Sequence, residues 1–100
     1  MKKILLDTDI GGDIDDALCL AYLLKEPACD LVGITTVCGE PEKRAAVAQV
    51  LCHTVGKDIP IVAGTDTFLW PNACYPTPEG APALAHCEHS WFKKGDAPAF

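Results

Sequence analysis

Strand-like and helix-like segments alternate along the first 63 residues, and this alternation is the strongest constraint on what the chain can fold into. Runs of apolar and β-branched residues at 3–6, 30–37 and 59–63 predict strands. Residues 14–25 and 41–54 lie between these runs and predict helices. The order β-α-β-α-β predicts the α/β class, with an open, mostly parallel sheet.

Both predicted helices have recognisable ends. Asp13 is a candidate N-cap for the first helix, and Pro27 ends that helix. Pro41 suits the first turn of the second helix, and Gly56 suits the C′ position just beyond its end. The first helix is expected to bury the apolar residues that recur at helical spacing, which are Ile14, Ala17, Leu18, Ala21 and Leu24.

The alternating pattern stops after Gly64. Residues 1–64 are therefore predicted to form a βαβαβ core with an acidic loop, and residues 65–100 a loop-rich segment of the same domain. A short helix is expected at 83–93. Three strands with two helices would leave an open sheet edge and one poorly covered face. We therefore expect these residues to be the amino-terminal part of a larger protein.

Most of the negative charge lies in one short stretch. Residues 7–16 contain five aspartates, namely Asp7, Asp9, Asp13, Asp15 and Asp16. The formal net charge is −6, and without these five residues it would be −1. Because a phosphate-binding surface must be basic, this balance argues against a nucleic-acid partner. A cation is the simplest partner for so local a cluster.

The acidic stretch falls where open α/β sheets bind their ligands. Asp7 and Asp9 follow the first predicted strand, and ligands bind beyond the carboxyl ends of such strands. Asp15 and Asp16 fall in the first turn of the following helix, where the helix dipole favours negative charge. Carboxylates from two elements are thus expected to converge, and their hard oxygens select Ca²⁺ or Mg²⁺ over zinc. A solvated acidic loop would be the simpler explanation for one or two aspartates.

The six cysteines are expected to be reduced thiols. They form no CxxC pair, which argues against a zinc ribbon. Cys19, Cys38 and Cys52 lie in apolar segments and are expected to be small core residues. The apolar stretch near the amino terminus is shorter than the roughly 7–15 residues of a signal-peptide core, and none approaches the ~20 residues that span a bilayer. We expect a cytoplasmic protein without a membrane partner.

Three motifs, taken in order, resemble those of one enzyme family. Residues 7–18 read DTDIGGDIDDAL, residues 33–39 read GITTVCG, and residues 60–64 read PIVAG. Together they resemble the inosine-uridine-preferring nucleoside hydrolases across residues 3–64. The resemblance implies a Rossmann-like nucleoside hydrolase fold, here incomplete, and hydrolysis of a ribonucleoside to a free base and ribose. It also implies a small ribonucleoside or related sugar as the partner, and a homo-oligomer at full length.

The resemblance further implies a bound Ca²⁺ that holds the attacking water and the ribose hydroxyls. By position, Asp9 would be a calcium ligand and the general base, and Asp16 a second ligand. Asp15 would lie with them at the metal and accept a hydrogen bond from a ribose hydroxyl. Asp7 and Asp13 would support the loop from behind the ligands. Negative charge near the sugar would stabilise an oxocarbenium-like transition state, and a metal makes its bound water more acidic.

The sequence also departs from the family pattern. Gly12 and Asp13 look like a two-residue insertion. Glu40 stands where the second motif usually ends in an Asn that contacts the substrate, so by position Glu40 would be a substrate contact. His86 and His89 are candidate substrate contacts, because the family has a histidine-bearing loop at comparable depth. The family's other calcium ligands and its leaving-group histidine lie further downstream, so residues 1–100 alone are predicted to be inactive.

Two other functions stay open. A Mg²⁺-dependent phosphatase of the haloacid dehalogenase type also has Asp-x-Asp after its first strand, although the residues that follow here differ from those it expects. A non-catalytic relative that binds a sugar or nucleoside is the second alternative, and Glu40 is the residue that supports it. Some polar residues away from the acidic loop are expected to lie on solvated surfaces of the second helix. These are His53 and the neighbouring pair Lys43 and Arg44.

Overall fold

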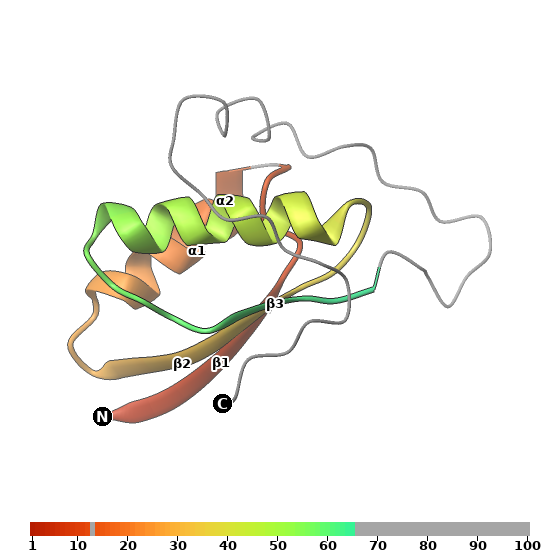
Figure 1. Ribbon diagram of the computed structural model, residues 1–100. Helices are drawn as coiled ribbons and strands as arrows, with labels where there is room; N and C mark the ends of the chain where they lie inside the picture. The colour runs from red at the N-terminus through yellow and green to blue at the C-terminus, as the bar shows by residue number, and fades with distance from the viewer. Residues whose placement is uncertain (13, 66–100) are drawn as a thin grey trace.

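The computed structural model, which describes residues 1–12 and 14–65, has the predicted β-α-β-α-β order (Figure 1). The elements are β1 (Lys2–Thr8), α1 (Ile14–Lys25), β2 (Cys29–Thr36), α2 (Pro41–Thr54) and β3 (Ile61–Ala63). Both helices have the predicted bounds, whereas β1 is longer than predicted, β2 is displaced by one residue and β3 begins only after Pro60. The prediction of an α/β protein is confirmed.

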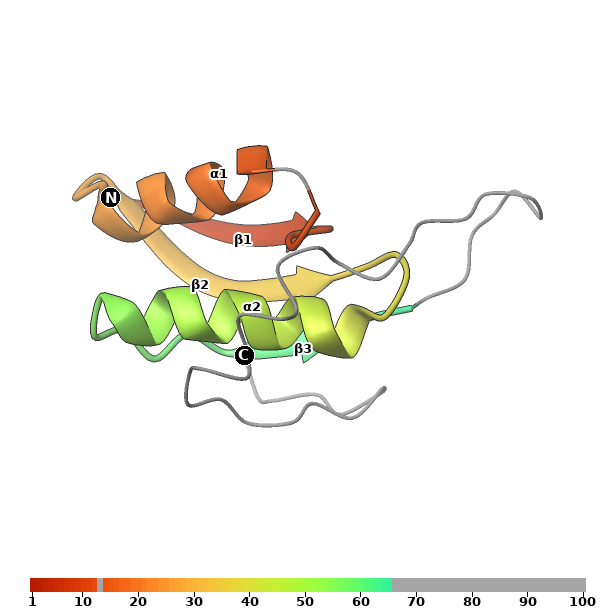
Figure 2. The same cartoon turned by 90° about the horizontal axis from the view of Figure 1, so that it is seen from above.

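The strands form one parallel sheet in the order β1-β2-β3. Asp7 is aligned with Thr35 and Thr8 with Thr36, so β1 and β2 end level with each other. Both helices lie on the same face of this sheet, as Figures 1 and 2 show from two directions. Within residues 1–12 and 14–65, no helix or strand lies on the opposite face, which we call the open face.

The core lies between the sheet and the two helices. Its buried members are Ile10, Leu20, Leu24, Leu31, Ile34, Ala45, Ala48, Cys52, Ile61 and Ala63. Side chains alternate along a strand, so Leu6 packs against this core while Leu5 points to the open face and is 60% exposed. The first strand was predicted to be buried, and this is wrong for every second residue, because the helices of the described part of the chain cover one face of the sheet.

The face that α1 turns to the core matches the predicted one only in part: Leu24 is buried and Ala17 is partly buried, as predicted, whereas Ala21 is exposed. Leu20 and Leu24 are buried, whereas Ile14 and Leu18 are 70% and 60% exposed. Cys19, predicted to be a core residue, is also exposed. Apolar residues lie along two sides of α1. The side that contains Leu20 and Leu24 is the one that packs against β2 and α2.

The end of α2 confirms the prediction of a C′ glycine. Gly56 has a φ of 73°, a left-handed conformation that glycine adopts without steric cost. Its amide donates to the carbonyl of His53 (3.0 Å), and the amide of Lys57 donates to the carbonyl of Cys52 (3.0 Å). These two bonds satisfy carbonyls that the helix end would otherwise leave unpaired.

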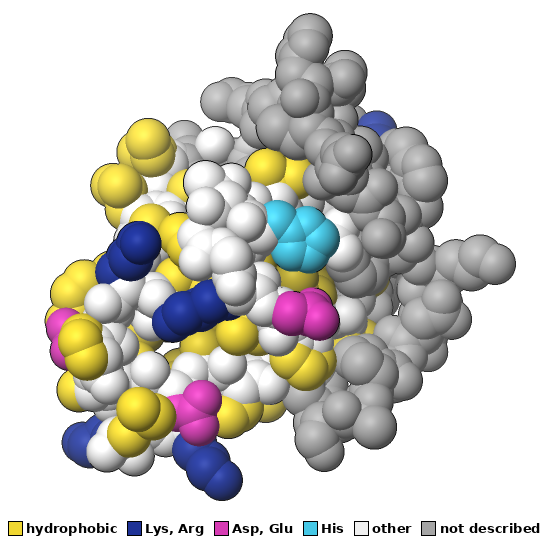
Figure 3. Space-filling view, turned by 60° about the vertical axis from the view of Figure 1, so that its left-hand side comes forward, with side chains coloured by type: hydrophobic (Ala, Val, Ile, Leu, Met, Phe, Trp, Pro, Cys, Tyr) yellow, Lys and Arg dark blue, Asp and Glu magenta, His cyan; other side chains and the backbone are white. Residues whose placement is uncertain are grey.

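Figure 3 shows the side of the molecule on which the strands begin, where basic, acidic and hydrophobic side chains of the described residues are intermingled.

None of the helices within the described ranges is both long enough and apolar enough to cross a bilayer. The predicted helix at 83–93 lies outside the described residues.

Candidate functional site

The acidic loop, residues 9–13, connects the carboxyl end of β1 to the start of α1. The side chain of Ile10 is fully buried in the core. Gly11 has a φ of 112°, a backbone conformation that residues with a side chain rarely adopt. The buried Ile10 and the left-handed Gly11 together turn the chain back, so that Asp9 and the first turn of α1 lie at the same end of the sheet.

Thr8 connects the end of β1 to α1. Thr8 is buried, and its Oγ1 donates a hydrogen bond to Oδ2 of Asp16 over 2.7 Å. The same hydroxyl accepts a hydrogen bond from the amide of Ile10 (3.1 Å). The amide of Asp9 also donates to Oδ2 of Asp16 (3.2 Å). One carboxylate oxygen thus accepts two hydrogen bonds, and these hold the Asp16 side chain against β1.

The carboxyl groups of Asp9 and Asp16 form a close pair. The pKa of Asp9 is raised, first because its carboxyl shares a hydrogen bond with Asp16, and then because of partial burial and the negative charge of Asp16. The pKa of Asp16 is lowered, first because it accepts the hydrogen bond from Asp9, and then because Thr8 donates another. Asp9 therefore keeps a shared proton more readily than Asp16 does.

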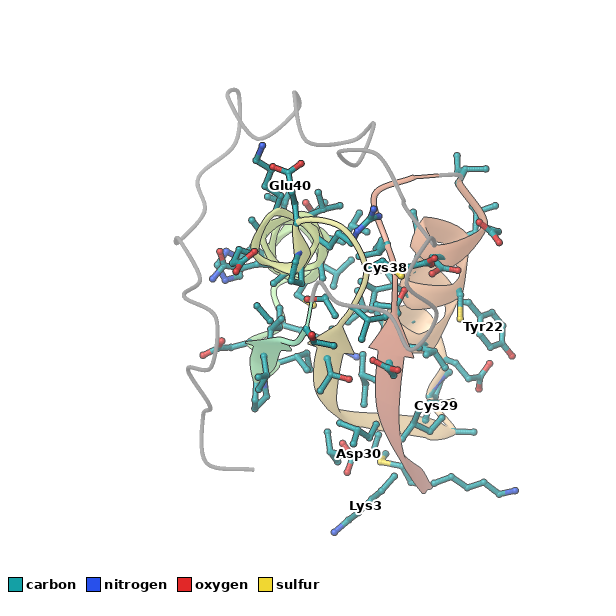
Figure 4. All side chains as sticks on the ribbon, turned by 90° about the vertical axis from the view of Figure 1, so that its right-hand side faces the viewer. Lys3, Tyr22, Cys29, Asp30, Cys38 and Glu40 are labelled. Atoms are coloured by element: carbon teal, nitrogen blue, oxygen red, sulfur yellow. The ribbon has the colours of Figure 1, made fainter. Side chains whose placement is uncertain are left out.

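The loop between β2 and α2, residues 37–40, lies beside the acidic loop. The amide of Val37 donates to the carbonyl of Thr8 (3.1 Å), which continues the pairing of β1 with β2 beyond the strands. Figure 4 looks at the carboxyl ends of the strands and shows Cys38 between β1 and α2, with Glu40 at the near end of α2. Partial burial and the charge of Asp9 raise the pKa of the Cys38 thiol.

Cys38 and Glu40 both have left-handed backbone conformations, with φ of 76° and 56°. For residues with side chains such a conformation costs on the order of 1 kcal/mol, so the surrounding structure must hold this loop in place. The carboxylate of Glu40 lies 2.8 Å from the ammonium of Lys43, and its carbonyl accepts hydrogen bonds from the amides of Lys43 and Arg44. The role of Glu40 toward a substrate stays a prediction.

Arg44 was predicted to lie on a solvated helix surface, and this is wrong: the residue is only 4% exposed. Its guanidinium donates to the carbonyl of Asp9 over 2.7 Å. Arg44 lies one helical turn before the buried Ala48, and this spacing is the sequence signal that could have placed it on the inner side of α2. Lys43 is partly exposed and His53 is exposed, as predicted.

The structure brings Asp9 and Asp16 together but places Asp7 on the open face. There Asp7 accepts a hydrogen bond from the hydroxyl of Thr35 over 2.8 Å. Asp15 is exposed in the first turn of α1. The other predicted site residues, Asp13, His86 and His89, lie outside the described residues. Within the ranges that the structure describes, no three His, Cys, Asp or Glu side chains gather as a metal site.

Comparison with known proteins identifies the family. The family model of the inosine-uridine preferring nucleoside hydrolase matches residues 4–93. The chain belongs to this family. It is 40% identical over 72 residues to probable uridine nucleosidase 2 of Arabidopsis thaliana, and 46% identical over 68 residues to the non-specific ribonucleoside hydrolase RihC of Salmonella paratyphi A. Uridine nucleosidase 1 of A. thaliana is 30% identical over 98 residues.

The chain spans about a quarter of the length of these nucleoside hydrolase relatives. The three matches cover 68%, 66% and 95% of this chain, but 22%, 22% and 26% of the respective relatives. The family assignment confirms what the three sequence motifs predicted.

The Asp9–Asp16 pair offers the type of ligand that a hard divalent cation binds. Carboxylate oxygens are the ligands that Ca²⁺ and Mg²⁺ prefer, and Ca²⁺ takes about six to eight of them. The amide of Asp9 brings the Asp16 carboxylate to the acidic loop, and the two carboxylates repel each other there; a cation bound between them would relieve this repulsion. The pair therefore fits part of a cation site, and other ligands would have to complete it.

Proposed function

We propose that the protein hydrolyses the N-glycosidic bond of a ribonucleoside, releasing the base and ribose, with Ca²⁺ bound at the acidic loop. The observation that supports this most directly is the paired carboxyl groups of Asp9 and Asp16 at the carboxyl end of β1, in a chain of the nucleoside hydrolase family. The names of the relatives, uridine nucleosidase and non-specific ribonucleoside hydrolase, favour a ribonucleoside as the substrate.

The geometry favours different roles for the two aspartates. Asp16 is held by Thr8 and by the amide of Asp9, so it suits a stationary metal ligand. Asp9 is exposed, so its carboxylate suits a ligand that also accepts a proton from the attacking water. The water oxygen would bond to the anomeric carbon, and the electron pair of the carbon–nitrogen bond would leave with the base. Bound Ca²⁺ would supply a more acidic water and a hold on the ribose hydroxyls.

The position of Asp7 argues against the phosphatase alternative. In the haloacid dehalogenase type, the first aspartate after the strand is the nucleophile. Here Asp7 lies on the open face and accepts a hydrogen bond from Thr35, whereas Asp9 pairs with Asp16. The family match also favours nucleoside hydrolysis over phosphoryl transfer, because the family and its relatives are named as nucleoside hydrolases.

An assay of base release tests the proposal. A polypeptide of the length of the relatives should release base and reducing sugar from inosine or uridine in the presence of Ca²⁺, and should not hydrolyse an aryl phosphate. Phosphate release would support the phosphatase alternative. Ribose binding detected by calorimetry without base release would support the non-catalytic alternative. Residues 1–100 alone are expected to be inactive.

Removal of Ca²⁺ gives a second test that needs no turnover. At a Ca²⁺ concentration 100 times its Kd, chelation should lower the free energy of unfolding by about 2–3 kcal/mol, because only the folded site binds the ion. Thermal denaturation with and without chelator measures this difference. An Asp16→Asn variant should lose most of the dependence on Ca²⁺. Equal melting temperatures with and without chelator in the unsubstituted protein would count against a metal site.

A further inference from the structure

Arg44 joins the two loops that meet at the carboxyl ends of β1 and β2. Its Nη1 donates to the carbonyl of Asp9 over 2.7 Å and to that of Ile10 over 3.3 Å. Its Nε donates to the carbonyl of Gly39 over 2.8 Å. The first two carbonyls belong to the acidic loop and the third belongs to the 37–40 loop, so one side chain fastens both loops to α2.

The burial of Arg44 indicates that these contacts matter for the arrangement of the loops. Since Arg44 as a whole is only 4% exposed, its guanidinium has given up much of its hydration, and this loss must be offset by hydrogen bonds. The planar guanidinium presents several donors in fixed directions, so it can reach carbonyls in two loops at once. A lysine at the same place would offer a single nitrogen and could not copy this geometry.

We propose that Arg44 is the positioning residue of the candidate site: by holding the carbonyls of Asp9 and Ile10, it sets where the Asp9 carboxyl lies relative to Asp16. The part of this inference that concerns Ca²⁺ rests on the proposed function, whereas the part that concerns the loop does not. Arg44 acts through the backbone of Asp9, and its own guanidinium is not assigned to the substrate or to the reacting atoms.

The direction in which the Ca²⁺ affinity changes when Arg44 is replaced distinguishes a positioning role from a purely electrostatic effect. A positive charge close to a cation site repels the cation, so removing the charge of Arg44 would by itself strengthen Ca²⁺ binding. Loss of positioning would instead weaken Ca²⁺ binding, because the two carboxylates would no longer be held at the right separation. The two effects of the same substitution therefore have opposite directions.

Calorimetric titration with Ca²⁺ in the absence of substrate, on a polypeptide of the length of the relatives, makes this measurement. Arg44→Met should raise the Kd for Ca²⁺ by roughly ten- to a hundredfold, as expected when a group that orients a metal ligand is removed. Lys43→Met is the matched control: it removes the same charge from the neighbouring residue, whose side chain is partly exposed, and should change the Kd by less than about twofold. Binding by Arg44→Met that is as tight as in the unsubstituted protein, or tighter, would overturn the proposal.

Amide hydrogen exchange without Ca²⁺ tests the loop directly. The amides of Asp9 and Ile10 donate to Asp16 and Thr8, so their exchange reports on the order of the acidic loop. In Arg44→Met their exchange should become about tenfold faster, while the amide of Ile34, which donates to Pro60, should keep its rate. Uniform acceleration of all three amides would show a merely structural role and contradict the proposal.

The two measurements distinguish failure of this inference from failure of the proposed function. If the unsubstituted polypeptide of the relatives' length binds no Ca²⁺, the metal site is wrong and hydrogen exchange alone decides the role of Arg44. If the unsubstituted chain binds Ca²⁺ and the exchange of Asp9 and Ile10 is unchanged in the variant, the positioning role is wrong. If Arg44→Met does not fold, Arg44→Lys, which keeps the charge, takes the place of that variant in both experiments. It should also weaken Ca²⁺ binding and speed the exchange of the Asp9 and Ile10 amides.

Discussion

Two threonine–aspartate hydrogen bonds lie at the carboxyl ends of β1 and β2, one on each face of the sheet. On the face that the helices cover, Thr8 donates to Asp16 over 2.7 Å. On the open face, Thr35 donates to Asp7 over 2.8 Å. The bonds have nearly the same length and chemistry, but Thr8 is buried and belongs to a network that also includes the amides of Asp9 and Ile10.

This comparison shows that burial, rather than the kind of bond, decides what a pair contributes. A hydrogen bond at the surface competes with water, so its net contribution to stability is small. A buried bond in a low-dielectric setting is stronger, and breaking it leaves polar groups without partners. The covered pair therefore builds the candidate site, while the open pair ties neighbouring strands together at the surface.

The largest expected effect concerns the aspartates on either side of Thr8. In a polypeptide of the length of the relatives, Asp9→Ala should lower kcat for base release by about 100-fold or more, since it removes the proposed base and a metal ligand. Asp7→Ala should cause a clearly smaller loss, because Asp7 lies on the other face. Steady-state assays with inosine or uridine measure both variants. Equal losses would contradict the different roles that we assign to the two faces.

A packing test at the end of β3 comes next. A Cβ atom at Gly64 would overlap with the carbonyl oxygen of Thr36, so Gly64→Ala must displace the end of β3 from β2. We expect a loss of about 2–3 kcal/mol in the free energy of unfolding, measured by urea denaturation. Gly12→Ala is the control, because nothing lies within 4 Å of the added Cβ there. A similar loss in both variants would show that the end of β3 is not packed as described.

The two threonines can be compared directly by replacing each hydroxyl with a methyl group. Thr8→Val should cost about 2 kcal/mol of stability, because it leaves a buried amide at Ile10 unpaired and removes a bond to the Asp16 carboxylate. Thr35→Val, at the more exposed pair, should cost about 0.5 kcal/mol or less. Denaturation midpoints of the two variants give the difference. A larger cost for Thr35→Val would reverse the comparison.

The smallest expected effect is a pH dependence that arises from the covered side of α2. Burial raises the pKa of the Cys52 thiol from 9.0 to about 11. Between these values the unfolded chain loses the thiol proton while the folded chain keeps it, so stability is full below pH 9 and falls as the pH rises toward 11. The loss should be on the order of 1–2 kcal/mol.

Unfolding experiments at several alkaline pH values, on the unsubstituted chain and on Cys52→Ala, isolate this contribution from that of the other alkaline groups. Cys19→Ala is the matched control, because Cys19 is exposed on α1. The alkaline loss of stability should be smaller in Cys52→Ala and unchanged in Cys19→Ala. Identical pH profiles for all three proteins would contradict the burial of Cys52.

The sequence predicted correctly those features that depend on neighbouring residues, and less well those that depend on residues far apart in the sequence. The bounds of α2 were predicted correctly because Pro41 and Gly56 act on the backbone next to them. The end of β1 was predicted too early because Thr8 pairs with Thr36, a residue far away in the sequence. The left-handed conformations of Cys38 and Glu40 could not be predicted, since neither residue type favours them and only the surrounding loops hold them.

By itself the sequence determined the order of the elements, the ends of both helices, the family, and the concentration of five aspartates in residues 7–16. All of these depend on residues that are neighbours along the chain or on motifs read in order. Only the tertiary structure decided that Asp16 is the partner of Asp9, that Asp7 lies on the open face and that Arg44 is buried beneath the acidic loop. The physical reason is that burial and pairing depend on which elements pack together, and no local stretch of sequence encodes that contact.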